Sequence, residues 1–278
     1  GICYGAGFAE DYEVFQLRID SIDDLHRLQG SKYVQSNPSN SYKQVENDLR
    51  SGRWVLYSVT SCMIAGLYSY LSFHKVCLDN LVTCDLICHG VPSPQLWKDN
   101  IQRQIHQYGK LIKTKFRDKK HGWHSHVESY LFESGAVVDE GYYTDLFYSH
   151  VALRACCYEC KYINNEIKPA DITMADFWGI SDTKIELTDD NTGISLAITH
   201  STKGLDLLRR ANLLVIDIDA ASATINNMHS SAQLPQWRNQ FWKDYKKHGY
   251  EYCLRKYSIY GGIVFKLKRK ILKMIGKW

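Results

Sequence analysis

The densest group of chemically reactive side chains in the sequence is Cys156-Cys157-Tyr158-Glu159-Cys160. Cys157 and Cys160 have C-x-x-C spacing, which allows two thiolates to bind one metal ion or cluster from a single turn. Such a pair can also be a redox-active dithiol. The redox arrangement requires the pair to open a helix after a strand, whereas this pair follows a predicted helix. Metal or cluster binding is therefore favoured.

Two further cysteines are predicted to follow neighbouring strands of a parallel sheet. Apolar runs at 54–59 and 81–87 predict buried strands, and residues 63–71 between them predict a helix. This strand–helix–strand order makes the two strands parallel. Cys62 and Cys88 follow the carboxyl ends of these strands, the edge at which open α/β sheets bind ligands. The two thiols could therefore share one site, or they could be buried separately.

The use of cysteine in the whole chain also favours chemistry for some thiols. The chain has nine cysteines, an odd number, so they cannot all pair in disulfides. Because no secretory leader is visible, we expect a cytoplasmic, reducing compartment. Cys62 and Cys88 could complete the ligand set of the C-x-x-C pair. Four thiolates suit either a [4Fe–4S] cluster or structural zinc. Core packing is expected for the thiols in apolar surroundings: Cys3, Cys77, Cys84 and Cys253.

The remaining patterns predict an α/β fold with a mixed sheet, a parallel βαβ core, an added β-hairpin and a helical C-terminal region. Ser93 and Pro94 are typical of a helix start. Strands are predicted on both sides of Ser134-Gly135, which indicates a hairpin. Further strands are predicted at 172–177 and 194–199, and helices at 142–153 and from residue 202 onward.

The net charge of +4 is distributed unevenly along the chain. Residues 243–278 contain 11 Lys and Arg against 2 acidic residues, whereas the other 242 residues are net negative, so we expect no nucleic-acid partner. Apolar residues spaced three or four apart between 264 and 278 predict a basic amphipathic helix. This helix could dock on its own domain or contact a membrane peripherally. We therefore expect a catalytic domain at 1–242 and a basic helical tail at 243–278.

Several segments, in the same order, resemble the coenzyme F420 hydrogenase/dehydrogenase beta-subunit family. The similar subgroup is the bacterial one found with polysaccharide-biosynthesis genes. The segments span roughly residues 1–205 and are Gly30–Ser36, Cys88–Pro94, Phe116–Trp123, Cys157-x-x-Cys160, Asp171–Gly179, Gly193–Leu196 and Thr202–Gly204.

This resemblance implies an iron–sulfur flavoprotein that transfers electrons between a donor and a substrate. The donor would be ferredoxin, reduced flavin or, if the host makes it, F420, and the implied partners include glycan-biosynthesis enzymes. The motifs imply that a [4Fe–4S] cluster is bound by Cys62, Cys88, Cys157 and Cys160. They also imply that FAD or its phosphates lie near Lys32, Tyr33, Gln35, Thr60, Arg117 and Lys119.

Two departures from the family pattern leave other functions open. The family usually has Gly-Thr-Pro-Cys-Gln at the first cysteine, where this chain has Val59-Thr60-Ser61-Cys62-Met63. The cysteine-rich, ferredoxin-like segment that precedes this domain in relatives does not appear in the sequence, so we expect an N-terminally truncated member. One alternative is a zinc-stabilised structural or interaction module that has lost flavin. Another is a carbohydrate-modifying transferase that uses the α/β crevice.

Overall fold

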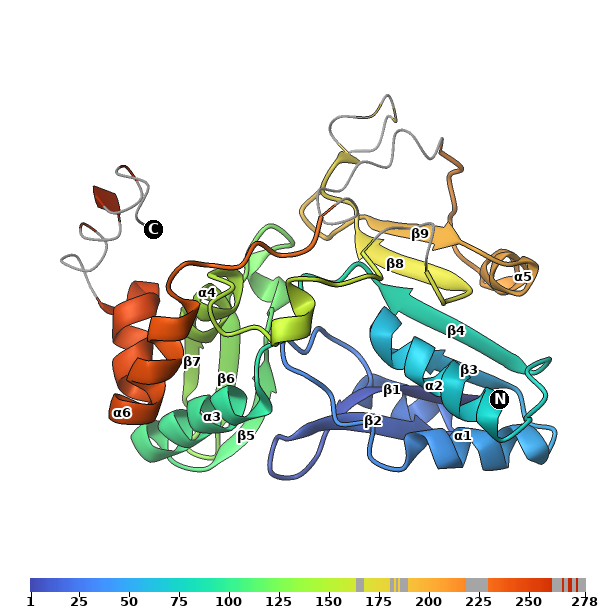
Figure 1. Ribbon diagram of the computed structural model, residues 1–278, viewed down its shortest axis with the longest axis horizontal. Coiled ribbons are helices and arrows are strands. Elements are labelled where there is room, and N and C mark those ends of the chain that lie inside the picture. The colour runs from blue at the N-terminus through green and yellow to red at the C-terminus, as the bar shows by residue number, and fades with distance from the viewer. Residues whose placement is uncertain are drawn as a thin grey trace.

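The computed structural model describes residues 1–163, 168–180, 183, 185, 190–218, 230–261, 267, 270, 271 and 274. These residues form two β-sheets that lie side by side, each covered by helices (Figure 1). The predicted α/β class with a mixed sheet is confirmed. None of the described helices combines the length and apolar character that crossing a membrane requires.

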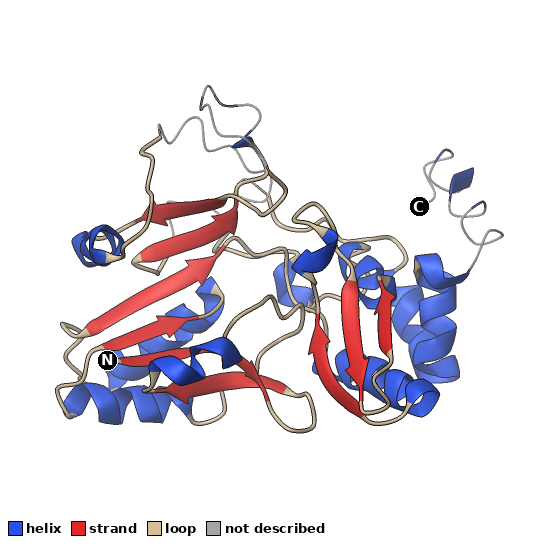
Figure 2. Cartoon of the chain, turned by 180° about the vertical axis from the view of Figure 1, so that it is seen from behind, coloured by secondary structure: helices blue, strands red, loops and turns tan. Residues whose placement is uncertain are grey.

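The larger sheet has six strands in the order β2-β1-β3-β4-β8-β9. The four central strands, β1, β3, β4 and β8, are parallel, and the edge strands β2 and β9 are antiparallel to their neighbours. The carboxyl ends of the four parallel strands face the second sheet (Figure 2). The bounds are β1 Ile2–Phe8, β2 Val14–Ile19, β3 Val55–Ser58, β4 Leu81–Leu86, β8 Ile172–Asp176 and β9 Ser195–Thr199.

Helices α1 (Ser41–Arg50) and α2 (Ser61–Phe73) cover one face of this sheet (Figure 1). The apolar side chains of α2 recur every three or four residues, so Ile64, Leu67 and Leu71 are all completely buried against the strands. β4 begins with three consecutive buried residues, as expected for a parallel strand covered on both faces. This packing fixes the start of α2 at the carboxyl end of β3.

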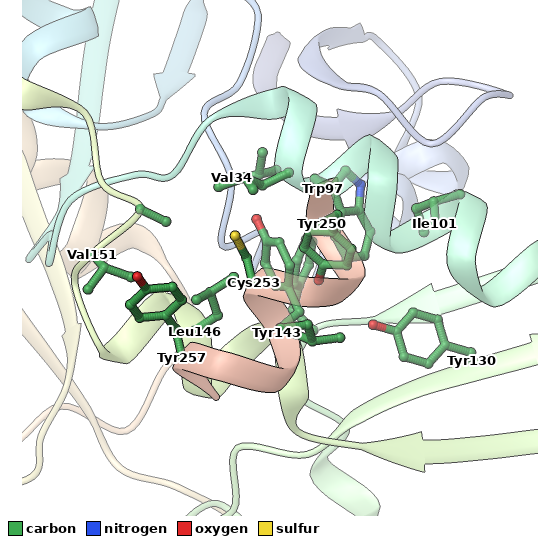
Figure 3. Close-up of a cluster of buried hydrophobic side chains, with 14 of the residues drawn as sticks. Val34, Trp97, Ile101, Tyr130, Tyr143, Leu146, Val151, Tyr250, Cys253 and Tyr257 are labelled. Atoms are coloured by element: carbon green, nitrogen blue, oxygen red, sulfur yellow. The ribbon is translucent and has the colours of Figure 1, made fainter. Parts of the chain in front are cut away.

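The smaller sheet is antiparallel, in the order β5-β6-β7, with bounds Leu111–Lys115, Glu128–Phe132 and Val137–Glu140. Beside it lie α3 (Pro94–Tyr108), α4 (Tyr142–Tyr148) and α6 (Arg238–Tyr257). Their buried side chains form one apolar core, in which Tyr250, Cys253 and Tyr257 of α6 lie close to Trp97 and Tyr143 (Figure 3).

The predicted strands, the βαβ unit, the hairpin and the helix that begins after Ser93 are confirmed. Ser93 accepts a hydrogen bond from the backbone N–H of Gln95, as a helix cap does. The predicted helix at 142–153 is wrong beyond residue 148, because His150 adopts a positive φ of 62° and turns the chain away. The C-terminal region is also less helical than expected, since residues 212–218 between α5 (Thr202–Arg210) and α6 are not helical.

The predicted division at residue 243 lies inside α6. The part of α6 that follows Trp242 includes core side chains, whereas most of the predicted amphipathic helix at 264–278 lies outside the described residues. Of its apolar positions, Leu267 and Ile271 are described, and both are helical and exposed. The separation of a tail from the domain remains a prediction.

Candidate metal centre

Two of the four predicted ligands lie at the carboxyl edge of the larger sheet. Cys62 is the second residue of α2, and the preceding helix cap, Thr60, lies with its Oγ1 3.4 Å from the Cys62 Sγ. Cys88 follows β4, and its Sγ accepts a hydrogen bond of 3.3 Å from the backbone N–H of Gly90. Because β3 and β4 are adjacent and parallel, both thiols come to the same end of the sheet.

The C-x-x-C segment reaches this edge through a long-range backbone contact. Pro92 and Leu153 form an antiparallel bridge, and the backbone N–H of Arg154 donates to the Val91 carbonyl at 3.0 Å. A short 3-10 turn, η3 (Ala155–Cys157), follows at once. The residues after α4 are therefore held against the loop that carries Cys88.

Cys62, Cys88, Cys157 and Cys160 line one cavity of about 50 Å³. Thr60, Ser61 and Lys168 add polar groups to its wall, and Val91, Tyr162 and Ile163 add apolar cover. The site is thus small and rich in sulfur; Cys88, Cys157 and Cys160 are half-buried in it, whereas Cys62 is exposed. The other five cysteines do not line it.

The pKa of the Cys88 thiol is raised to about 12, mainly by burial. The hydrogen bond from Gly90 lowers it, and the neighbouring Cys157, Cys62 and Cys160 raise it. Burial likewise raises the pKa of Cys157 to about 11. Burial and the neighbouring thiols therefore favour the protonated forms of Cys88 and Cys157. Metal or cluster binding would supply the missing positive charge and release these protons.

Among the described residues, no group of three or more His, Cys, Asp or Glu side chains is arranged to hold a metal ion directly. The four thiols line a common cavity. A four-iron cluster is larger than a single ion and is bound through one thiolate at each iron, so it suits thiols that line a cavity. The four thiols suit either an iron–sulfur cluster or a zinc ion chemically.

Of the six residues predicted to lie near flavin, three line one of two cavities and three line neither. Thr60 lines the cysteine cavity, whereas Lys32 and Arg117 line a second cavity of about 490 Å³. That cavity lies between the end of β1 at Phe8 and β5, so it opens at the same edge of the larger sheet. Neither cavity is lined by Tyr33, Gln35 or Lys119.

The 490 Å³ cavity combines cationic and aromatic groups. Lys32 donates to the carbonyls of Leu28 and Gln29 at 3.0 and 2.8 Å, and burial lowers its pKa to about 8. An anion beside Lys32 would stabilise its charged form. The other cationic and aromatic residues in the wall are His26, Arg27, Lys113, Lys115, Arg117, Phe8, Tyr12 and Phe116. A volume of this size is typical of small-molecule and cofactor sites.

Arg117 is held mainly by the protein itself. Its side chain is 5% exposed, and it pairs with Asp176 at the end of β8. It also donates to the carbonyls of Ser125 and Trp123 and lies 5.0 Å from the ring centre of Trp178. Arg117 therefore ties the smaller sheet to β8 and contributes to the cavity wall from a fixed position.

Tyr33 packs in the aromatic core beside the site. Its ring stacks on Phe147 with centroids 4.9 Å apart and an interplanar angle of 8°. Its carbonyl accepts a hydrogen bond of 2.9 Å from the hydroxyl of Tyr143. The backbone N–H of Gln35 donates to Pro92, and exposed Lys119 donates to Thr192, both at 3.4 Å. These three residues hold loops around the site.

Asp85 and the paired lysines of β5 were not predicted as site residues. Lys113 and Lys115 alternate along β5, and this Lys-x-Lys pattern is the signal that could have placed two cations on one face. Asp85 is a carboxylate inside an otherwise buried strand, which is itself a signal because buried carboxylates need partners.

Fold and site together define an α/β protein with a cysteine-lined cavity at the carboxyl edge of a parallel sheet. Residues 52–222 match the family described as the C terminus of the coenzyme F420 hydrogenase/dehydrogenase beta subunit. The match covers more than half of the chain, which therefore belongs to this family, and the predicted membership is confirmed. The description names hydrogenase and dehydrogenase subunits, so the chain is related to redox, electron-transfer proteins.

Twelve chains of known structure match this protein. One belongs to the F420-reducing [NiFe] hydrogenase complex from Methanosarcina barkeri. It shares 15% sequence identity and a TM-score of 0.49, over 76% of this chain and 66% of that chain. This protein therefore spans less than two thirds of that relative's length. No curated protein matches.

Proposed function

We propose that this protein is an electron-transfer subunit or oxidoreductase whose cysteine cavity holds a [4Fe–4S] cluster. The observation that carries this proposal is the convergence of Cys62, Cys88, Cys157 and Cys160 on one cavity from three separate parts of the chain. When bound, the cluster supplies a centre that accepts and releases single electrons. The protein's own contribution is to deliver four thiols and to fix the loops that carry them.

The 490 Å³ cavity is the proposed binding site for a flavin such as FAD. Lys32 and the β5 lysines offer positive charge for phosphates, and Phe8, Tyr12 and Phe116 offer aromatic surface for a ring system. Both cavities open at the carboxyl edge of the same sheet, which would allow flavin and cluster to exchange electrons. A flavin converts single electrons into two-electron or hydride chemistry.

The electron donor is proposed by chemical class. A ferredoxin, reduced flavin or F420-type deazaflavin would pass electrons to this protein, and a partner protein or substrate would receive them. Family membership supports a redox partner. The association with glycan biosynthesis and the peripheral membrane contact through the basic tail remain proposals that rest on the sequence.

The test compares cysteine variants purified without oxygen. Cys157→Ser and Cys160→Ser should each lose most of the bound iron and acid-labile sulfide, because a cluster needs its thiolates. Cys77→Ser is the matched control, since Cys77 is exposed and does not line the cavity. Full iron and sulfide in either cavity variant would overturn the assignment. Stoichiometric zinc without sulfide in the unaltered protein would support the structural-module alternative.

A further inference from the structure

A buried ion pair lies in the wall of the cysteine cavity. Lys168 lines the cavity, and its Nζ lies 3.5 Å from Oδ2 of Asp85. The side chains of Lys168 and Asp85 are 2% and 0% exposed, so both charges are withdrawn from water. Burying two charges is costly unless further hydrogen bonds stabilise them, so this pair requires a structural or functional reason.

The pair is joined directly to the helix that carries Cys62. The Lys168 Nζ donates to the Ser61 hydroxyl at 3.1 Å, and the Ser61 hydroxyl donates to Asp85. Ser61 is the first residue of α2 and is itself buried. Lys168 and Asp85 therefore fix the start of α2 one residue before the first proposed ligand.

Only the positively charged member of the ion pair lines the cavity. Lys168 is part of the cavity wall, whereas Asp85 is on β4 and is not. Asp85 accepts a second hydroxyl, that of Thr173 on β8, at 2.5 Å. Hydrogen bonds from Ser61 and Thr173 thus disperse the negative charge of Asp85, and the positive end of the pair lies in the cavity wall.

We propose that Lys168 is a positioning residue that raises the electron affinity of the group bound in the cysteine cavity. This inference rests on the proposed function. An added electron makes a thiolate-bound cluster more negative, and a nearby cation in a water-poor site stabilises that state. Asp85 orients the lysine and, because it is farther from the cavity, offsets this effect only in part.

The experiment is a spectroscopic redox titration of the cluster-containing, full-length protein. Lys168→Met removes the cation and should weaken electron binding at least tenfold, a shift of about 59 mV to more negative potential for one electron. Asp85→Asn keeps the lysine and removes the anion, so its potential should be more positive than that of the unaltered protein. Lys168→Arg retains the charge and should stay close to the unaltered value.

The order of the potentials distinguishes the two roles. A merely structural ion pair would lower stability in the variants and leave their potentials alike, and equal potentials in Asp85→Asn and the unaltered protein would overturn the inference. If Lys168→Met does not fold, the double variant with Asp85→Asn removes both charges, and it too should be more negative than the unaltered protein. An unaltered protein without any cluster would instead refute the proposed function.

Discussion

Gly90 and Cys157 approach each other so closely that a Cβ atom on Gly90 would lie 3.1 Å from the Cys157 Cβ. The same atom would lie 2.8 Å from a methyl carbon of Leu153, and Gly90 has a φ of 110°, which L-residues rarely adopt. The absence of a side chain at Gly90 therefore lets the loop after β4 and the C-x-x-C segment meet.

Gly90→Ala should consequently lose most of its bound iron and sulfide. The new methyl group must push Leu153 and Cys157 away, which separates the thiols. Gly135→Ala is the matched control, since Gly135 also has a positive φ, 84°, but nothing lies within 4 Å of an added Cβ. Both variants should lose about 1 kcal/mol of stability from backbone strain. Equal iron content in the two variants would contradict the proposed contact.

Lys32→Met should weaken flavin binding about tenfold, or about 1.4 kcal/mol, because it removes a half-buried cation from the 490 Å³ cavity. In the unaltered protein, flavin affinity should fall as the pH rises through about 8, because Lys32 loses its proton there. Fluorescence titration at several pH values measures both effects. Lys98→Met, which changes an exposed residue of α3, is the control. Unchanged affinity in Lys32→Met would place the flavin elsewhere.

Glu128 makes stability depend on pH. This completely buried carboxyl accepts hydrogen bonds from the Tyr130 hydroxyl and the Thr144 backbone, yet burial raises its pKa from 4.5 to about 7. A raised folded-state pKa gives stability that is complete below the unfolded pKa and is lost as the pH rises through the folded pKa. The contribution of Glu128 to the free energy of unfolding should therefore fall between about pH 4.5 and 7, by on the order of 3 kcal/mol.

Urea unfolding at a series of pH values tests this expectation. Glu128→Gln cannot ionise, so the unfolding free energy of the unaltered protein should fall relative to that of Glu128→Gln over the same interval. Glu133→Gln, at an exposed position, should retain the slope of the unaltered protein. Identical slopes in the unaltered protein and Glu128→Gln would show that Glu128 does not titrate with the shifted pKa.

Helix α6 should contribute strongly to stability although it crosses the predicted start of the basic tail. Leu254 is completely buried in the core beside the smaller sheet. Leu254→Ala should cost about 2–5 kcal/mol, because it removes apolar contacts and leaves a cavity. Lys247→Ala changes an exposed residue of the same helix and should cost less than about 0.5 kcal/mol. Similar midpoints of urea unfolding would show that α6 is not part of the core.

The βαβ unit and the meeting of Cys62 with Cys88 could be predicted because they follow from local patterns. Strands β3 and β4 are short apolar runs separated by one helix, and this order alone makes them parallel. The arrival of Cys157 depends instead on the bridge between Pro92 and Leu153, 61 positions apart. No local periodicity encodes such a contact, so the sequence patterns left a shared site as one possibility, and the family resemblance implied it.

Strand β5 was not predicted, and the predicted boundary at residue 243 falls inside helix α6. In β5 the register shifts between Leu111 and Lys113, so its buried residues do not alternate. In α6 the helical backbone is interrupted at Gly249, which has a φ of 79°. Charge composition therefore suggested a boundary at residue 243, inside a helix whose buried face continues through Tyr257.

The central claim is that the four cysteines hold an iron–sulfur cluster. Its most direct test is the content of iron, acid-labile sulfide and zinc per chain in protein purified without oxygen. The account predicts about four irons and four sulfides per chain, with little zinc. Stoichiometric zinc without sulfide, or neither metal, would contradict it.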